Sequence, residues 1–180
     1  TINSMGNTED IITKYLRDSS KLMAQPIQGR TDRQGKGNVK VTKVTLFQNN
    51  KPVDELISGT DTVIRVKYHA LDQPKNPITV AIAINEASSQ GRLVILSSSV
   101  LNKNIAIPKN KKDHFVDFFI RKLPFSPGTY SYNIWIDCQG EMLDWVIEAG
   151  KFTVLFGDYY HSGKLPQQSQ GSVLLDYDIL

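Results

Sequence analysis

The chain has 180 residues, 40% of them hydrophobic, which is enough to bury the core of one ordinary domain. No stretch approaches the roughly 20 apolar residues that a membrane-spanning helix needs, and the first residues lack the basic-then-apolar pattern of a secretion signal. A net charge of +3, dispersed along the chain, does not indicate a nucleic-acid partner, and none is expected. Cys138 is the single cysteine, so no internal disulfide is expected, and a cytoplasmic location is favoured.

The N-terminal part of the chain is predicted to precede the main fold. A short amphipathic helix is expected from Glu9 to Leu16, because acids occupy its first turn and apolar residues recur at helical spacing. The polar stretch 21–38, rich in Gly, Gln and Arg, predicts a linker. Two interpretations of residues 1–20 stay open: the helix docks on the domain that follows, or it is the tail of a preceding domain.

From Val39 onward the pattern changes to short strands separated by turn signals such as Asn49-Asn50 and Gln139-Gly140. Nine strands are predicted, with no helix between them: residues 39–47, 62–69, 78–85, 93–100, 115–121, 130–137, 143–147, 151–155 and 172–177. So many short strands do not fit in one layer. The sequence therefore predicts an all-β fold, an immunoglobulin-like antiparallel β-sandwich with a short N-terminal helix.

Motifs for catalysis or cofactor binding are not found in the sequence. The glycine-containing stretch 29–37 lacks the spacing of a phosphate loop, so no nucleotide site is expected. His69, His114 and His161 are far apart, and Cys138 has no signature around it, so neither a metal site nor a nucleophile is predicted. We expect no catalytic residue, no metal and no cofactor.

Four acids leave one enzymatic alternative open. Asp137, Glu141, Asp144 and Glu148 flank one predicted hairpin, and a glycoside hydrolase needs only two well-placed carboxylates. Surface hairpins often carry acids that have no catalytic role. A binding protein is therefore the preferred interpretation.

The C-terminal third carries the most informative pattern. It combines Asp144-Trp145 with Phe152-x-Val154 and continues from Gly157-Asp158 to Gly163-Lys164. The approach to the first strand, Gly29-Arg30 to Gly35-Lys36-Gly37, agrees with the same pattern. Together these segments resemble the C-terminal domain of the ATP-binding subunit (Wzt family) of ABC transporters that export O-antigen polysaccharide. In that family the domain follows the nucleotide-binding domain and recognises the glycan.

The resemblance implies a cytoplasmic, non-catalytic domain that binds lipid-linked O-antigen, which the family handles on undecaprenyl diphosphate. It also implies a parent polypeptide that is an ATPase subunit, a transmembrane subunit as partner, and a location at the inner face of the bacterial inner membrane. Residues 1–20 would be the helical tail of the ATPase domain, 21–38 the linker and 39–180 the carbohydrate-binding sandwich. Which sugar is bound, and whether a chain end or an internal repeat is recognised, stays open.

A glycan site needs flat aromatic rings for the C–H faces of the sugar and polar side chains for its hydroxyl groups. On the strand 130–137, the side away from the core carries Asn133, Trp135 and Asp137, a ring between two polar groups. This trio is the first predicted site. The alternative for Trp135 is that the other sheet or a loop covers it.

Further candidates lie elsewhere in the chain. A second group ranks behind the first: Arg65, Lys67 and His69, on the outer side of the strand 62–69, would suit a glycan that carries a phosphate or an acid, and Asp117 is a similar candidate on its own strand. Tyr159 and Tyr160 occupy a polar loop, where they either stack on sugar, contact a partner, or pin the loop to the sandwich. Trp145 is predicted to be core.

The C-terminal strand, residues 172–177, is apolar at alternate positions and needs cover. The long polar segment 157–171 can carry it to a second chain at modest entropic cost. Since the resemblance suggests strand exchange, we expect a homodimer. A purely structural dimerisation module is the remaining alternative function.

Overall fold

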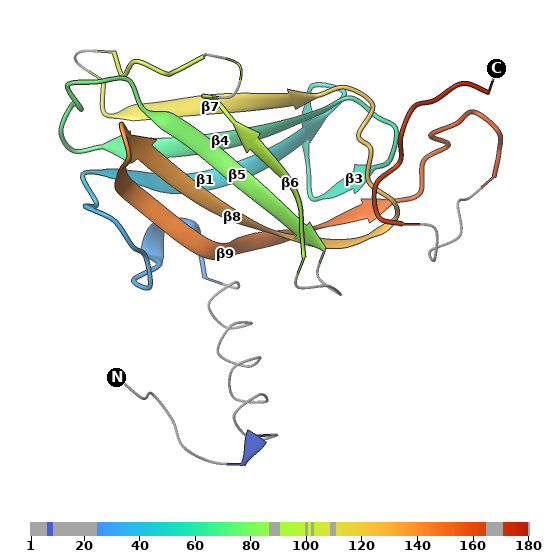
Figure 1. The fold of residues 1–180 in the computed structure, drawn as a ribbon, viewed down its shortest axis with the longest axis horizontal. Coiled ribbons are helices and arrows are strands. Elements are labelled where there is room, and N and C mark those ends of the chain that lie inside the picture. Colours follow the sequence, from blue (N-terminus) through green and yellow to red (C-terminus); the bar gives the residue numbers. More distant parts are fainter. Residues whose placement is uncertain are drawn as a thin grey trace.

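A computed structural model describes residues 7–8, 25–86, 91–99, 101, 103–108, 111–164 and 171–179 of the chain. These residues form a two-sheet β-sandwich preceded by a 3₁₀ turn, η1 (Ile27–Gly29) (Figure 1). The strands are β1 (Val39–Gln48), β2 (Lys51–Val53), β3 (Glu55–Ile57), β4 (Thr62–Ala70), β5 (Thr79–Glu86), β6 (Arg92–Ser97), β7 (Asp113–Ile120), β8 (Gly128–Cys138) and β9 (Glu141–Leu155).

Two sheets pack face to face. The four-stranded sheet has the order β2-β1-β4-β7, and the five-stranded sheet has the order β3-β9-β8-β5-β6. Neighbouring strands are antiparallel except for β3, which is parallel to β9. The predicted all-β, immunoglobulin-like sandwich is confirmed, with this short parallel strand as the one departure from an antiparallel pattern in the described part of the chain.

Alternation of apolar and polar side chains explains why the strands pair in this register. On β4, Ile64 and Val66 are fully buried, whereas Lys67, which follows Val66, is exposed. On β8, Ile134 and Ile136 are likewise fully buried and Trp135 between them points to the outer face. Because successive side chains of a strand point to opposite sides, one face of each sheet forms the core and the other face meets solvent.

The tight turns follow from residues that tolerate a left-handed backbone. Asn49 and Asn50 connect β1 to β2 with φ of 51° and 62°, and Gln139 and Gly140 connect β8 to β9 with φ of 53° and 85°. Two-residue hairpins that match the twist of the strands need positive φ at both central positions. Both turns were predicted from the sequence.

The strands predicted at residues 143–147 and 151–155 are in fact one continuous strand, β9. Glu148, Ala149 and Gly150 resemble a turn in the sequence, and Glu148 does adopt a positive φ of 47°. The chain does not reverse there, because pairing with β8 resumes after a register shift. A bulge, not a turn, separates the two halves. The three-residue strands β2 and β3 were not predicted, because strands this short carry too little periodicity.

The predicted C-terminal strand does not form within this single chain. Residues 171–179 make one isolated β-bridge, between Val173 and Phe125, and Leu174 N–H donates to Pro124 O at 2.7 Å. Leu174 is buried, whereas Ile179 is 90% exposed. The strand predicted at residues 172–177 is therefore absent from the described chain, where the segment buries the Leu174 side chain and leaves Leu175, Tyr177 and Ile179 exposed. Exchange of the segment between two chains stays a prediction.

The N-terminal expectations have two different outcomes. The predicted helix from Glu9 to Leu16 lies outside the described residues. The stretch 27–38, predicted as part of the linker, packs on the sandwich: Ile27 is buried in the core, and Gln34 forms a β-bridge with Trp145 (Figure 1, blue segment). The sandwich therefore begins before Val39.

Candidate functional site

The outer face of the five-stranded sheet carries the three residues of the first predicted site. Asn133, Trp135 and Asp137 alternate along β8 with core residues and so point to the same side. In the register, Trp135 lies opposite Trp145 of β9 on one side and Ala81 of β5 on the other. The sheet therefore sets the two tryptophans of the chain side by side on adjacent strands.

A shallow groove of about 260 Å³ runs over this part of the sheet. Ala83 of β5, a small and fully buried residue, lines its floor beside the larger side chains of the neighbouring strands. The groove brings together residues from β5, β6, β8, β9 and the β8–β9 turn. Its lining residues are Ala83, Arg92, Asn133, Trp135, Asp137, Gly140, Met142 and Trp145.

Hydrogen bonds to the main chain orient the two polar side chains that flank Trp135. Asn133 Oδ1 accepts the N–H of Glu148 at 2.7 Å, which leaves its amide nitrogen as the group able to donate to a ligand. Asp137 Oδ1 accepts the N–H of Gly140 at 3.0 Å, and its second oxygen can accept. The groove thus offers a fixed donor and a fixed acceptor on either side of an aromatic ring. Arg92, exposed at the groove, adds a cation.

Trp145 was predicted to be core, and this prediction is wrong. The structure places it partly exposed on the outer face, in the groove. The reason is a register shift between β8 and β9: Ile136 pairs with Asp144 and Asp137 pairs with Met142, so Leu143 is an extra residue on β9. Sequence reasoning also missed Arg92 and Met142. Arg92 and Met142 lie near Trp135 only because of how the neighbouring strands pair, and no local sequence pattern predicts that pairing.

The second predicted group lies on the outer face of the other sheet. Arg65 and Asp117 are cross-strand partners on β4 and β7, and two hydrogen bonds of 2.7 Å join the guanidinium to the carboxylate. This pairing raises the pKa of Arg65. The guanidinium also lies over the rings of Phe115 and Phe47, at 4.3 and 5.0 Å from their centroids. Arg65 and Asp117 therefore satisfy each other.

Lys67 and His69 share this outer face. Lys67 is exposed opposite Phe115, and His69 Nδ1 lies 2.9 Å from Asp113 Oδ1. The four-stranded sheet thus keeps the whole second group on one face, away from the tryptophan groove of the five-stranded sheet. The two predicted groups are separate surfaces.

Comparison with protein families decides the relationship of the chain to known proteins. The family model described as the Wzt C-terminal domain matches residues 30–170. The chain belongs to the Wzt C-terminal domain family. A crystal structure of the C-terminal domain of wzt is similar to the chain with a TM-score of 0.67 and 15% sequence identity, and the match covers 88% of this chain and 93% of that one. At this identity the likeness shows the shared fold. A search of curated proteins found no match to the sequence.

Membership of the Wzt C-terminal domain family supports a role in O-antigen export by an ABC transporter, as the C-terminal domain of its ATPase subunit. Within the part of the chain that the structure describes, no helix is long and apolar enough to cross a membrane. The family match begins at Arg30, so it includes most of the stretch that packs on β9 ahead of the first strand.

In this Wzt C-terminal domain Tyr159 and Tyr160 both contact the rest of the fold, and a contact of Tyr160 with sugar or a partner stays a prediction. Tyr159 is buried, and the Lys122 ammonium lies 4.4 Å from the centroid of its ring. Tyr160 is more exposed, but its hydroxyl donates to Leu175 O at 3.0 Å and its ring meets Tyr177 edge-on at 6.0 Å. The pair pins the loop and the C-terminal segment to the sandwich, and it does not line the groove.

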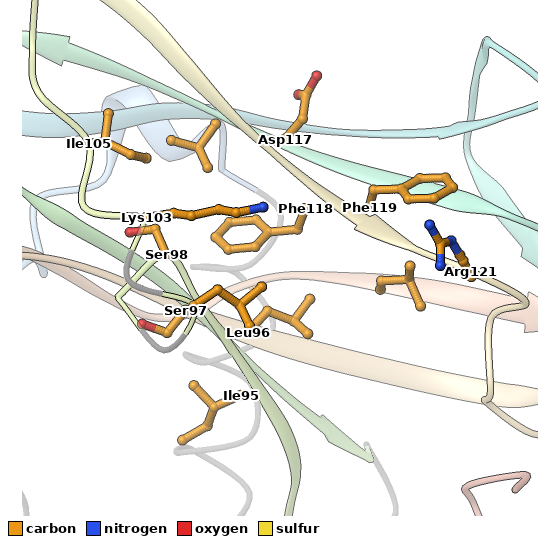
Figure 2. Close-up of a pocket in the computed structure, with 13 residues that line it drawn as sticks. Ile95, Leu96, Ser97, Ser98, Lys103, Ile105, Asp117, Phe118, Phe119 and Arg121 are labelled. Carbon is orange, nitrogen blue, oxygen red and sulfur yellow. The ribbon is translucent and has the colours of Figure 1, made fainter.

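A larger hollow, of about 750 Å³, lies on the open flank of the sandwich between β6 and β7 (Figure 2). Core-facing side chains of both edge strands remain partly exposed there, among them Leu96 and Phe118, while Lys103 and Arg121 supply charge. Figure 2 shows Phe118 near the middle of the hollow and Arg121 toward one end. Its described lining residues include Phe118, Phe119 and Asp117 but neither tryptophan, and Asp117 is already bound to Arg65.

The four acids considered for hydrolysis do not converge on the groove. Asp144 is 1% exposed and turned toward β1, where it accepts hydrogen bonds from Arg33 and from the N–H of Val41. Burial raises the pKa of Asp144. Glu141 pairs with Lys36 on the surface. Of the four, Asp137 alone lines the groove. No cluster of three or more metal-ligating side chains occurs among the described residues.

Proposed function

We propose that this domain binds polysaccharide in the groove on the outer face of its five-stranded sheet, without cleaving it. The observation that carries the proposal is the placement of Trp135 and Trp145 side by side on a solvent-facing sheet, flanked by oriented polar groups. Tryptophan is usually well buried in folded proteins. Two of them held on an outer face suit a ligand with flat apolar surfaces.

Sugars meet this description. A pyranose ring has C–H faces that pack on aromatic rings and a rim of hydroxyl groups that need both donors and acceptors. Asn133 can donate through its amide nitrogen, Asp137 can accept, and the two indole N–H groups can donate. Arg92 can bind an acidic or phosphorylated substituent. A shallow, solvated groove of this kind favours weak binding, in the micromolar to millimolar range.

The family supplies the context of the ligand. We propose that the polysaccharide is an O-antigen, presented on undecaprenyl diphosphate, and that the domain acts in the cytoplasm at the inner face of the bacterial inner membrane. Its partner in export would be the transmembrane subunit of the transporter, through the parent polypeptide. We also propose a homodimer in which C-terminal segments exchange, supported by the exposed apolar side chains Leu175, Tyr177 and Ile179.

A fluorescence titration tests the binding proposal directly, because both tryptophans of the chain line the proposed site. Adding O-polysaccharides from several bacteria to the domain should change the emission with at least one of them. Dextran, a polysaccharide without O-antigen structure, is the control. Emission that no O-polysaccharide alters, together with no heat of binding, would count against the proposal.

The two alternative functions predict different results. A glycoside hydrolase would shorten a purified O-polysaccharide on prolonged incubation, which size-exclusion chromatography detects. The commitment of Asp144 to Arg33 argues against this activity, since it leaves the groove with a single one of the four acids. A purely structural dimerisation module would form dimers but show no affinity for any polysaccharide.

A further inference from the structure

The segment 30–37, which we call the strap, runs along the side of β9 that faces away from β8. Gln34 N–H donates to Trp145 O at 3.0 Å, and Trp145 N–H donates to Gln34 O at 2.7 Å. Lys36 N–H donates to Met142 O at 3.2 Å. Since Trp145 and Met142 line the groove, the strap is hydrogen-bonded to the main chain of two groove residues.

Arg30, at the start of the strap, holds the bulge of β9. Its side chain is 1% exposed, and its guanidinium donates to Ile147 O at 2.8 Å and to Glu148 O at 2.9 Å. Two further hydrogen bonds of 2.6 Å to the Asp32 carboxylate orient the guanidinium. Glu148 has a φ of 47°, which a residue with a side chain rarely adopts, so the surroundings must stabilise this conformation.

Asn133 holds the same bulge from the groove side. Its side-chain oxygen accepts the N–H of Glu148 at 2.7 Å, while Arg30 binds the carbonyl oxygen of the same residue. The bulge is therefore fixed between a strap residue and a groove residue. Because bulges set the direction of nearby side chains, a change on the strap side changes the groove side.

We propose that Arg30 is a positioning residue for the groove: through the bulge at Glu148 it fixes Asn133 and Trp145 for contact with polysaccharide, and a bound polysaccharide in turn tightens the strap. The inference rests on the proposed function for the identity of the ligand. This coupling is reciprocal. If the ordered strap raises the affinity for polysaccharide by some factor, bound polysaccharide shifts the strap toward its ordered state by the same factor.

Three variants and a matched control test the positioning role. Arg30→Met removes the guanidinium, and Arg30→Lys keeps the charge but loses its planar fork. Gly35→Ala acts on the strap independently, because Gly35 has a φ of 111° and a Cβ there would lie 2.7 Å from the carbonyl carbon of Leu143. Gly29→Ala is the control, since a Cβ at Gly29 meets nothing within 4 Å.

The first readout needs no ligand. In the free protein, Arg30→Met and Gly35→Ala should alter the near-UV circular dichroism of the two tryptophans and increase their quenching by acrylamide, with Arg30→Lys intermediate and Gly29→Ala unchanged. If Arg30→Met does not fold, Arg30→Lys carries the test of Arg30, and Gly35→Ala tests how the strap is held on β9 at Leu143. Folded variants whose tryptophan signals match the wild type would overturn the positioning role.

The second readout is hydrogen exchange in the unmodified chain. Saturation with an O-polysaccharide that it binds should slow exchange of the Gln34, Lys36 and Gly37 amides by about 5-fold or more, and the strap variants should weaken binding by a similar factor. Unchanged exchange at saturation would overturn the coupling. If the wild type binds no polysaccharide, the proposed function fails, and the ligand-free tryptophan signals alone then decide the role of Arg30.

Discussion

Replacing Asp144 by asparagine should destabilise the domain strongly, although the two side chains have nearly the same shape. The Asp144 carboxylate is 1% exposed and joins three parts of the fold: it belongs to β9, accepts the N–H of Val41 on β1 at 2.7 Å, and binds Arg33 of the strap at 2.8 Å. The Arg33 side chain is itself only 10% exposed. Asp144→Asn would leave the Arg33 guanidinium buried without its ion-pair partner.

The magnitude follows from this burial. Breaking a buried ion pair by removing one partner costs about 3–5 kcal/mol, because the remaining charge stays desolvated. The asparagine side chain would still offer an oxygen to the Val41 N–H, so we expect the lower end, about 3 kcal/mol. For a domain of this size that corresponds to a fall in Tm of about 6–12 °C. The double variant Arg33→Met with Asp144→Asn should recover most of the loss, because it removes both charges.

Urea unfolding followed by tryptophan fluorescence measures all four proteins of this double-mutant cycle under one set of conditions. The expected coupling free energy between the two sites is about 2 kcal/mol or more. Asp144→Asn within about 0.5 kcal/mol of the wild type would refute the reasoning, as would additive effects of the two substitutions.

Further predictions concern the rest of the chain. Tyr130→Phe should cost about 1 kcal/mol in urea unfolding, because the buried Tyr130 hydroxyl donates to Ser126 O at 2.7 Å. Since the Arg30 guanidinium lowers the pKa of Asp32, this carboxyl stabilises the fold above its ordinary pKa of 3.8 and loses that contribution as the pH falls, so Asp32→Asn should flatten the acid side of the stability profile. Deleting the chain from Gly171 onward should convert a dimer into a less soluble monomer in light scattering, and a full-length chain that is monomeric at high concentration would contradict the exchange. The isolated domain should neither bind nor hydrolyse ATP in a coupled assay, and turnover by the pure protein would contradict the domain assignment.

Strand alternation made most of the fold predictable. On β8, Tyr130, Tyr132, Ile134 and Ile136 recur at every second position, so the sequence alone places Asn133, Trp135 and Asp137, which lie between or beside them, on one outer face. The turn chemistry of Asn49-Asn50 and Gln139-Gly140 likewise reports local conformation directly. The fold and the groove residues on β8 could be predicted because they depend on such local signals.

The groove residues on β9 depend on which residues of β8 and β9 pair, and a local sequence pattern does not determine this register. The extra residue Leu143 moves Trp145 from the expected core face to the outer face, and a sequence pattern does not specify where β9 gains a residue relative to β8. The strap was missed for a related reason. Its polar composition resembles a linker, but Arg30 makes its hydrogen bonds to carbonyls more than 100 residues away in the chain.

The most direct test of glycan binding in the tryptophan groove is a calorimetric titration. An O-polysaccharide that the wild type binds is titrated into the wild type, Trp135→Ala and Phe119→Ala. Phe119 is the matched control, an aromatic residue 56% exposed on the outer face of the other sheet. Trp135 is partly buried, so its truncation should cost about 2–3 kcal/mol of stability, which a domain of ordinary stability survives. We predict that folded Trp135→Ala loses at least about 30-fold in affinity, whereas Phe119→Ala binds as the wild type does. Undiminished binding by folded Trp135→Ala would contradict the account.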